Sequence, residues 1–178
     1  MAPSTKLAFS FLVSASLIAS AATAQLVTEG GQKFSVILSG ANECTNAGVC
    51  GVGDMNASGT ADITVNPGQR RICWEITTTG VHAQYSISGA HIHPGAAGAN
   101  GGALIHLTAE ENGTATGCTT TLTPGGTPLT RAQIDQIRRS PENFYINVHW
   151  VDTDPAAPAL QSFAAGAIRG QLSKGRLK

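Results

Sequence analysis

The sequence predicts an all-β fold: an antiparallel sandwich or flattened Greek-key barrel with one short helix. About eight short strand-like runs follow one another at regular spacing, several of them alternating between apolar and polar residues, and loops rich in glycine and proline separate them. Only one stretch, residues 129–139, changes to the spacing of a helix. No regular alternation of strands and helices is present, so a parallel α/β sheet is not expected.

The N-terminal half is expected to hold a strand, a disulfide-bearing loop and a hairpin. The two strands of the hairpin flank an Asn-Pro-Gly-Gln turn, which is a typical chain reversal. In its second strand, Ile72, Trp74 and Ile76 are expected to face the core. The predicted strands of this half are Lys33–Ser39, Gly59–Val65 and Arg70–Thr77.

The C-terminal half carries five further predicted strands and the helix. The helical spacing covers Leu129 to Arg139, with Thr130 as the expected N-cap and Gln133 completing a capping-box pattern. Trp150 follows a strand at a loop mouth, where we expect it to be exposed and available to a partner. The five strands are Tyr85–His93, Ala103–Leu107, Ala115–Leu122, Phe144–His149 and Gly166–Leu172.

Residues 1–24 are expected to form a signal peptide. Lys6 is followed by an apolar run from Leu7 to Ala19, and Ala22-Thr-Ala24 offers the small residues that precede a cleavage site. The apolar run is shorter than the roughly 20 residues that span a membrane. We therefore expect an exported protein, secreted or periplasmic, with no membrane insertion and with residues 25–178 as a single domain.

Charge and cysteine content narrow the function classes. The formal net charge is +0, so we expect neither nucleic acid nor an anionic lipid surface as a partner. Four cysteines in an exported chain are typical of disulfides. We favour Cys44–Cys50, which flank a short loop, and Cys73–Cys118, which lie in separate predicted strands. The other pairings and a thiolate metal site remain alternatives.

Four motifs in order resemble the CHRD domain, the module named from chordin. They are Phe34-x-Val-x-Leu-Ser-Gly-Ala-Asn-Glu43, Gly89-Ala-His-Ile-His93, Pro141-Glu-Asn-Phe-Tyr-Ile-Asn-Val-His149 and Gly166-Ala-Ile-Arg-Gly-Gln-Leu172. The resemblance covers about residues 34–172 and implies an extracellular immunoglobulin-like β-sandwich without a settled activity. Family members often continue with Pro-Pro-Val after the position of Glu43, whereas here Cys44 begins the loop between the first two cysteines.

The histidines are the candidates for chemistry. In an extended chain His91 and His93 point to the same face, and such a pair can bind one copper or zinc ion when a third ligand joins it. His149 is the best third candidate, His106 the next, and His82 a weak one. The alternative is structural: the imidazoles donate hydrogen bonds to backbone carbonyls of the glycine-rich loop and brace it.

Other polar motifs have mainly structural interpretations. Arg169 lies in a run that otherwise resembles a buried strand, so we expect an ion pair with Glu43 or Glu142. Asn56 and Asn112 begin N-glycosylation acceptor patterns, whose use the sequence does not decide. No Gly-x-Ser-x-Gly, phosphate-binding or His-Glu-x-x-His motif is present.

Three hypotheses about function follow. The first is a non-catalytic CHRD-like binding or matrix module, not an enzyme, with an extracellular protein or matrix partner and no certain cofactor. The second is a copper- or zinc-binding protein that uses His91, His93 and His149. The third, a superoxide dismutase-like enzyme, rests only on the shared His-x-His strand, because no bridging histidine loop or metal-holding aspartate is recognisable.

Overall fold

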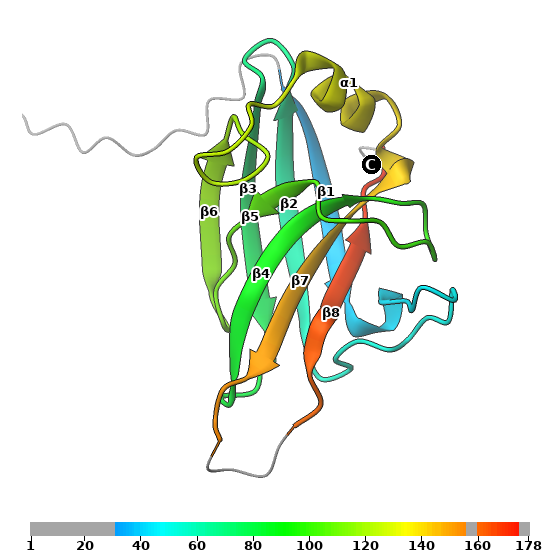
Figure 1. The fold of residues 1–178 in the computed structure, drawn as a ribbon, viewed down its shortest axis with the longest axis vertical. Coiled ribbons are helices and arrows are strands. Elements are labelled where there is room, and N and C mark those ends of the chain that lie inside the picture. Colours follow the sequence, from blue (N-terminus) through cyan, green and yellow to red (C-terminus); the bar gives the residue numbers. More distant parts are fainter. Residues whose placement is uncertain (1–30, 156–159, 175–178) are drawn as a thin grey trace, which may run out of the picture.

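The computed structural model describes residues 31–155 and 160–174 (Figure 1). The predicted signal peptide, residues 1–24, lies outside the described residues. The all-β prediction is confirmed: eight antiparallel strands and one short α-helix, with two single-turn 3₁₀ helices, make up the described fold. The strands are β1 Gln32–Ser39, β2 Ser58–Asn66, β3 Arg71–Thr79, β4 Tyr85–Pro94, β5 Ile105–Leu107, β6 Thr114–Thr119, β7 Phe144–Asp152 and β8 Phe163–Gln171; the helix α1 is Arg131–Arg139, and the 3₁₀ helices η1 and η2 are Gly40–Asn42 and Pro141–Asn143.

The strands form two layers around one core. Their hydrogen-bonded order is β5-β4-β7-β8-β1-β2-β3-β6, and Figure 1 shows β4, β7 and β8 in front of β1, β2, β3 and β6. The layers join where Ser39 of β1 pairs with Arg169 of β8. The sheet therefore folds over on itself as a sandwich, while the specifically immunoglobulin-like arrangement implied by the resemblance stays a prediction.

Alternation along each strand fills the space between the layers. The residues predicted to face inward on β3 (Ile72, Trp74 and Ile76) are all buried, and so are those predicted to share one face on β7 (Phe144, Ile146 and Val148). Because successive strand side chains point to opposite faces, the polar residues between them lie on the outer face of each layer. The candidate site therefore has to form on an outer face, not in the core.

The helix closes one end of the sandwich. Thr130 and Gln133 form the predicted capping box, in which the Thr130 hydroxyl accepts from the Gln133 backbone N–H. Ile134 and Ile137 are buried against the core beside Leu129. The helix begins at Arg131, directly after the predicted N-cap Thr130, which takes the extended conformation of that position.

Both favoured disulfides are present. Cys44–Cys50 closes the loop after η1, and Cys73–Cys118 joins β3 to β6 at directly opposed positions of the ladder. None of the described cysteines is free, so no thiolate ligand is on offer among them. No helix within the described ranges is both long and apolar enough to cross a membrane.

The prediction that Trp150 is exposed was wrong. Its side chain is 0% exposed and packs near Tyr85 and Phe163 in the core. β7 does not end at His149 but continues to Asp152, so Trp150 keeps the inward direction that alternation gives to Val148 two residues earlier. The tryptophan is part of the core and offers no surface to a partner.

Candidate metal centre

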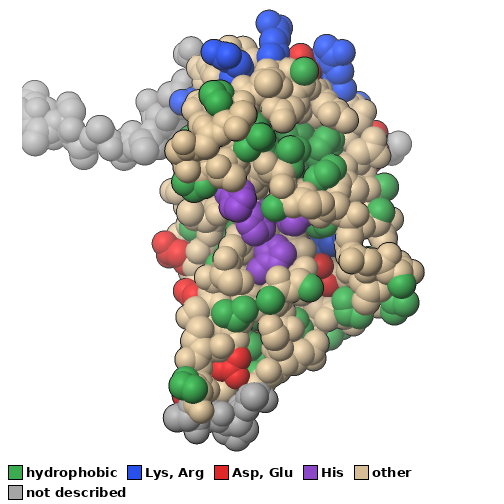
Figure 2. Space-filling model, in the orientation of Figure 1, with side chains coloured by type: hydrophobic (Ala, Val, Ile, Leu, Met, Phe, Trp, Pro, Cys, Tyr) green, Lys and Arg blue, Asp and Glu red, His purple; other side chains and the backbone are tan. Residues whose placement is uncertain are grey.

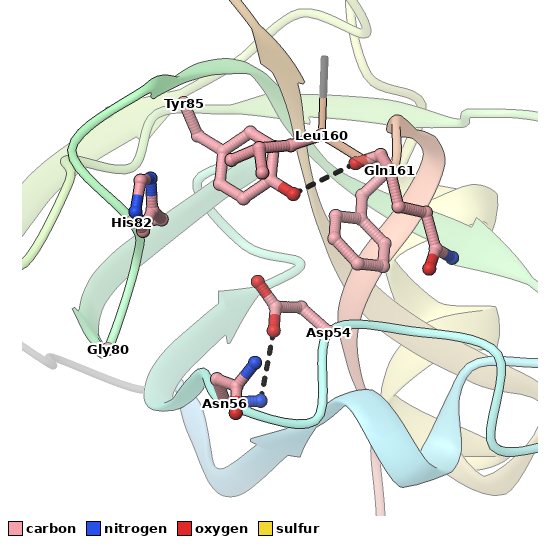
Figure 3. Close-up of a pocket in the computed structure, with 8 residues that line it drawn as sticks. Asp54, Asn56, Gly80, His82, Tyr85, Leu160 and Gln161 are labelled. Atoms are coloured by element: carbon pink, nitrogen blue, oxygen red, sulfur yellow. Dashed lines mark hydrogen bonds between the residues drawn. The ribbon is translucent and has the colours of Figure 1, made fainter. Parts of the chain in front are cut away.

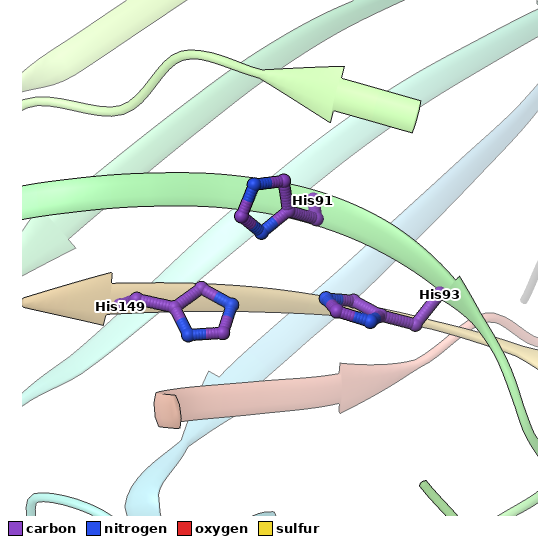
Figure 4. Close-up of side chains that lie close together, drawn as sticks. All are labelled: His91, His93 and His149. Atoms are coloured by element: carbon purple, nitrogen blue, oxygen red, sulfur yellow. The ribbon is translucent and has the colours of Figure 1, made fainter. Parts of the chain in front are cut away.

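Strand pairing brings three of the predicted histidines together. On the outer face of the front layer, His91 and His93 of β4 lie beside β7, where His149 is directly opposite Gly89. Each of the three offers a ring nitrogen, and these nitrogens lie within 4.8 Å of one another. Figure 2 shows the histidine side chains gathered at the middle of this face, and Figure 4 shows the three rings turned toward a common space.

Two of the three rings are oriented by backbone carbonyls. The Nδ1 atom of His93 donates to the Gly101 carbonyl at 2.9 Å, and that of His149 donates to the Ala164 carbonyl at 3.0 Å. A neutral imidazole carries a single proton, so the Nε2 atom of both rings is left with its lone pair. Carbonyl contacts of this kind fix the orientation of metal-ligating histidines.

Three remaining nitrogens of the group are buried and have no hydrogen-bond partner within the described chain. They are His91 Nδ1, His93 Nε2 and His149 Nε2, three of the four ring nitrogens that the carbonyl contacts leave over. A buried polar atom without a partner costs free energy, and native proteins contain few of them. Three such atoms in one place therefore point to something that the group holds besides protein.

Burial also keeps the imidazoles neutral. It lowers the pKa of His91 to about 4, aided by the nearby His149, His106 and His93, and it lowers the pKa values of His93 and His149. Near neutral pH all three rings are therefore neutral, and the nitrogen of each that carries no proton can bind a metal.

Gly89 makes room for the His91 ring. A Cβ atom at this position would lie 2.8 Å from His91 Cε1 and 3.1 Å from His91 Nε2, closer than ordinary contact. The ring thus lies over the glycine, whose partner on β7 is His149. Gly89 begins one of the four CHRD-like motifs, and its place two residues before His91, on the same strand face, was the signal for this role.

His106 and His82 do not join the group. His106 is directly opposite His91 on β5, and their ring centroids are 4.5 Å apart. Because β5 and β7 flank β4 on opposite sides, His106 approaches His91 from the side away from His149. His82 is exposed in the turn before β4. The group of His, Cys, Asp and Glu side chains found in the described ranges contains His91, His93 and His149, with no carboxylate.

Asn147 and Glu43 add further buried polar atoms beside the histidines. Asn147 is opposite both His91 on β4 and Arg169 on β8, and its Nδ2 donates to Glu43 Oε2 at 3.3 Å. Asn147 Oδ1 and Glu43 Oε1 are buried without a partner in the described chain. Burial raises the pKa of Glu43 to about 7, although the charge of Arg169 and the Asn147 hydrogen bond oppose this shift.

The direct ion pair predicted for Arg169 does not form. Among the described residues, neither Glu43 nor Glu142 forms an ion pair with Arg169. The guanidinium instead donates to the Asn100 side chain and to the carbonyls of Ala96 and Ala99. These acceptors in the glycine-rich loop satisfy the buried cation in place of a carboxylate.

The same arginine completes a stack under the loop. Its guanidinium carbon lies 3.4 Å from the Tyr145 ring centroid, and the His93 ring is nearly parallel to that of Tyr145, with centroids 4.8 Å apart. Asn100 in turn donates to the Cys44 carbonyl at 2.7 Å. The loop that covers His93 is thereby fixed both to the sheet and to the segment closed by Cys44–Cys50.

Comparison with protein families agrees with this architecture. The model of the CHRD domain matches residues 34–172, which is most of the chain. This chain belongs to the CHRD domain family. The match contains both histidine strands, the arginine strand and the segment of Glu43. Comparisons with curated proteins and with solved structures return no match.

Proposed function

We propose that this CHRD-domain protein binds a copper or zinc ion through His91 Nδ1, His93 Nε2 and His149 Nε2. The observation that carries the proposal is the convergence of three buried, unpartnered ring nitrogens within 4.8 Å of one another. We further propose that the domain acts as an exported, non-catalytic binding module. The disulfides of the described fold support export, since such bonds persist in oxidising compartments.

The spacing of the nitrogens suits a metal after a small closure. Three atoms no more than 4.8 Å apart have a common point within about 2.8 Å of each, and metal–imidazole bonds are about 2.0–2.1 Å long. The required movement of each nitrogen is at most about 0.7 Å, which small side-chain rotations supply.

The structural and ligand interpretations of the histidines support one another. The Gly101 and Ala164 carbonyls brace two rings through Nδ1, which explains one nitrogen of each ring but leaves Nε2 without a role. In a metal site the same two contacts act as outer-shell orienting bonds. A brace alone gives no reason for the unpartnered nitrogens to face one another.

The donor set selects the class of ion. Three imidazoles suit copper and zinc, whereas calcium and magnesium prefer oxygen ligands. With three protein ligands, at least one coordination position stays open in a tetrahedral site. The buried oxygens of Asn147 and Glu43 that lack a partner in the described chain are acceptors that a water molecule beside the histidines would satisfy.

Isothermal titration calorimetry on metal-stripped protein tests the proposal. We expect one equivalent of Cu(II) or Zn(II) to bind tightly at neutral pH, and His149→Ala to weaken binding by about 100-fold or more as one of three ligands is lost. His82→Ala is the matched control, because that histidine is exposed and outside the group. Electron paramagnetic resonance of the Cu(II) form should show coupling to imidazole nitrogens.

Two outcomes decide against the metal centre. One is the absence of stoichiometric binding of either ion by folded protein at neutral pH. The other is binding that His82→Ala and His149→Ala weaken equally, which would indicate nonspecific surface coordination. Thermal unfolding of each variant in chelator verifies that a loss of binding is not a loss of folding.

A further inference from the structure

A second concave site lies at the end of the sandwich opposite α1. It is a pocket of about 380 Å³, within the usual size range of small-molecule sites (Figure 3). Its walls come from the loop before β2, the turn between β3 and β4, the segment before β8, and the first residues of β4 and β8. His91, His93 and His149 do not line it, so it is separate from the candidate metal centre.

Asp54 places a carboxylate in this pocket without a cationic partner. The residue is 5% exposed, and its Oδ1 atom accepts from the Asn56 backbone N–H at 2.9 Å. Figure 3 shows the other carboxylate oxygen pointing into the space between Tyr85 and His82. No Lys, Arg or His forms an ion pair with Asp54 in the described parts of the chain. The carboxylate is therefore available to pair with a positively charged ligand.

Aromatic rings form the adjoining wall. Tyr85 and Phe163 pack edge to face, with ring centroids 5.7 Å apart. The Tyr85 hydroxyl donates to the Gln161 carbonyl at 2.9 Å, so its proton is not available to a ligand. A ligand in the pocket would therefore contact Tyr85 through its aromatic ring. Aromatic faces attract organic cations through their quadrupole.

The electrostatic field in the pocket is also negative. Partial burial raises the pKa of Tyr85, and the negative charges of Asp54 and Asp152 raise it further. Lys and Arg side chains gather instead at the end where α1 lies (Figure 2), and none of them lines the pocket. A positively charged ligand meets no repulsion there.

We propose that this pocket binds a small organic ammonium ion, with Asp54 as the counter-charge and Tyr85 and Phe163 as the apolar, cation-attracting wall. A bare divalent metal ion fits the site less well, because such ions need several oxygen ligands and a single carboxylate lines the pocket. An organic cation with a diffuse charge uses both the carboxylate and the rings. The ammonium group belongs to a free small molecule or to a lysine side chain of a partner.

Choline and its neutral isostere 3,3-dimethyl-1-butanol test the charge requirement directly. We expect titration of ¹⁵N-labelled protein to shift the amide signals of Gly80, Tyr85 and Gln161, with choline binding at least about tenfold more tightly than the isostere. A parallel titration with Nα-acetyl-lysine methylamide distinguishes the sources. Tighter binding of the lysine derivative assigns the site to a protein partner, and tighter binding of choline assigns it to a free ammonium compound.

Two variants that each remove one negative charge test whether choline binds in the pocket or responds only to the overall charge of the protein. Asp54→Asn keeps an oxygen to accept from the Asn56 N–H, so the fold is retained, and we expect it to weaken choline binding by about tenfold. Glu75→Gln, on the exposed face of β3, removes the same charge elsewhere and should change nothing. Equal binding of choline and the isostere, an unaffected Asp54→Asn variant, or no amide shifts with any probe overturns the proposal.

Discussion

Replacing Gly89 by alanine is the sharpest test of how the candidate metal centre is built. The substitution adds one methyl group, 2.8 Å from His91 Cε1, where ordinary contact begins at 3.4 Å. The His91 ring must therefore move by about 0.6 Å, comparable with the roughly 0.5 Å tolerance of a metal-ligand constellation. We expect the affinity for Cu(II) or Zn(II) to fall by about 10- to 100-fold, or about 1.4 to 2.7 kcal/mol.

The chain provides a matched control for this substitution. Gly102 has nothing within 4 Å of the position of an added Cβ, so Gly102→Ala should bind metal as the wild type does. Calorimetry of both variants, with thermal unfolding in chelator, separates the effect on the site from an effect on folding. The double variant Gly89→Ala with His91→Ala should bind no more weakly than His91→Ala alone, because the methyl group acts only through that ring. Equal affinities of Gly89→Ala and Gly102→Ala would refute the reasoning.

Two further predictions concern stability. Glu43 has a folded-state pKa of about 7 against 4.5, so its stabilising contribution is full below pH 4.5 and is lost as pH rises through 7. In the absence of metal, the free energy of unfolding of Glu43→Gln should therefore rise relative to that of the wild type between pH 4.5 and 8, by on the order of 3 kcal/mol. If urea unfolding gives the same difference between the two proteins at every pH, this prediction is wrong. Replacing Cys73 and Cys118 by alanine should lower the free energy of unfolding by about 4 kcal/mol, because their disulfide closes a loop of 45 residues. The same change at Cys44 and Cys50 should lower it by about 2 kcal/mol, because that loop spans 6 residues. If denaturant titrations show the larger loss for the Cys44 and Cys50 variant, the entropy of the closed loop is not the main source of stabilisation by these disulfides.

Alternation along the chain was enough to predict most of the fold. Each of the eight strands overlaps a predicted one, several of which were found by their two-residue period, and the change of period at Leu129 located the helix. Trp150 shows where this reasoning was applied incompletely. Its parity with Phe144, Ile146 and Val148 already placed it on the core face, but ending the strand at His149 treated it as a loop residue.

The candidate site was less predictable because it depends on which strands are neighbours. Alternation places His91, His93 and His149 on polar strand faces, but β4 and β7 are far apart in sequence, and their register sets the distances between rings. The same holds for Arg169, whose partners are backbone carbonyls of a distant loop. A sequence shows where carboxylates are, but not which carbonyls a fold leaves free.

The position of β7 in the strand order has a consequence for amide hydrogen exchange. β7 is hydrogen-bonded on both sides, to β4 and to β8, whereas β5 and β6 are at the two ends of the strand order. Amide protons of β7 should exchange with solvent only in the rarest openings, and those of the end strands much sooner. His149, Asn147 and Tyr145 therefore belong to the last part of the molecule to open, and the candidate centre keeps its shape through the local fluctuations that loosen the edges.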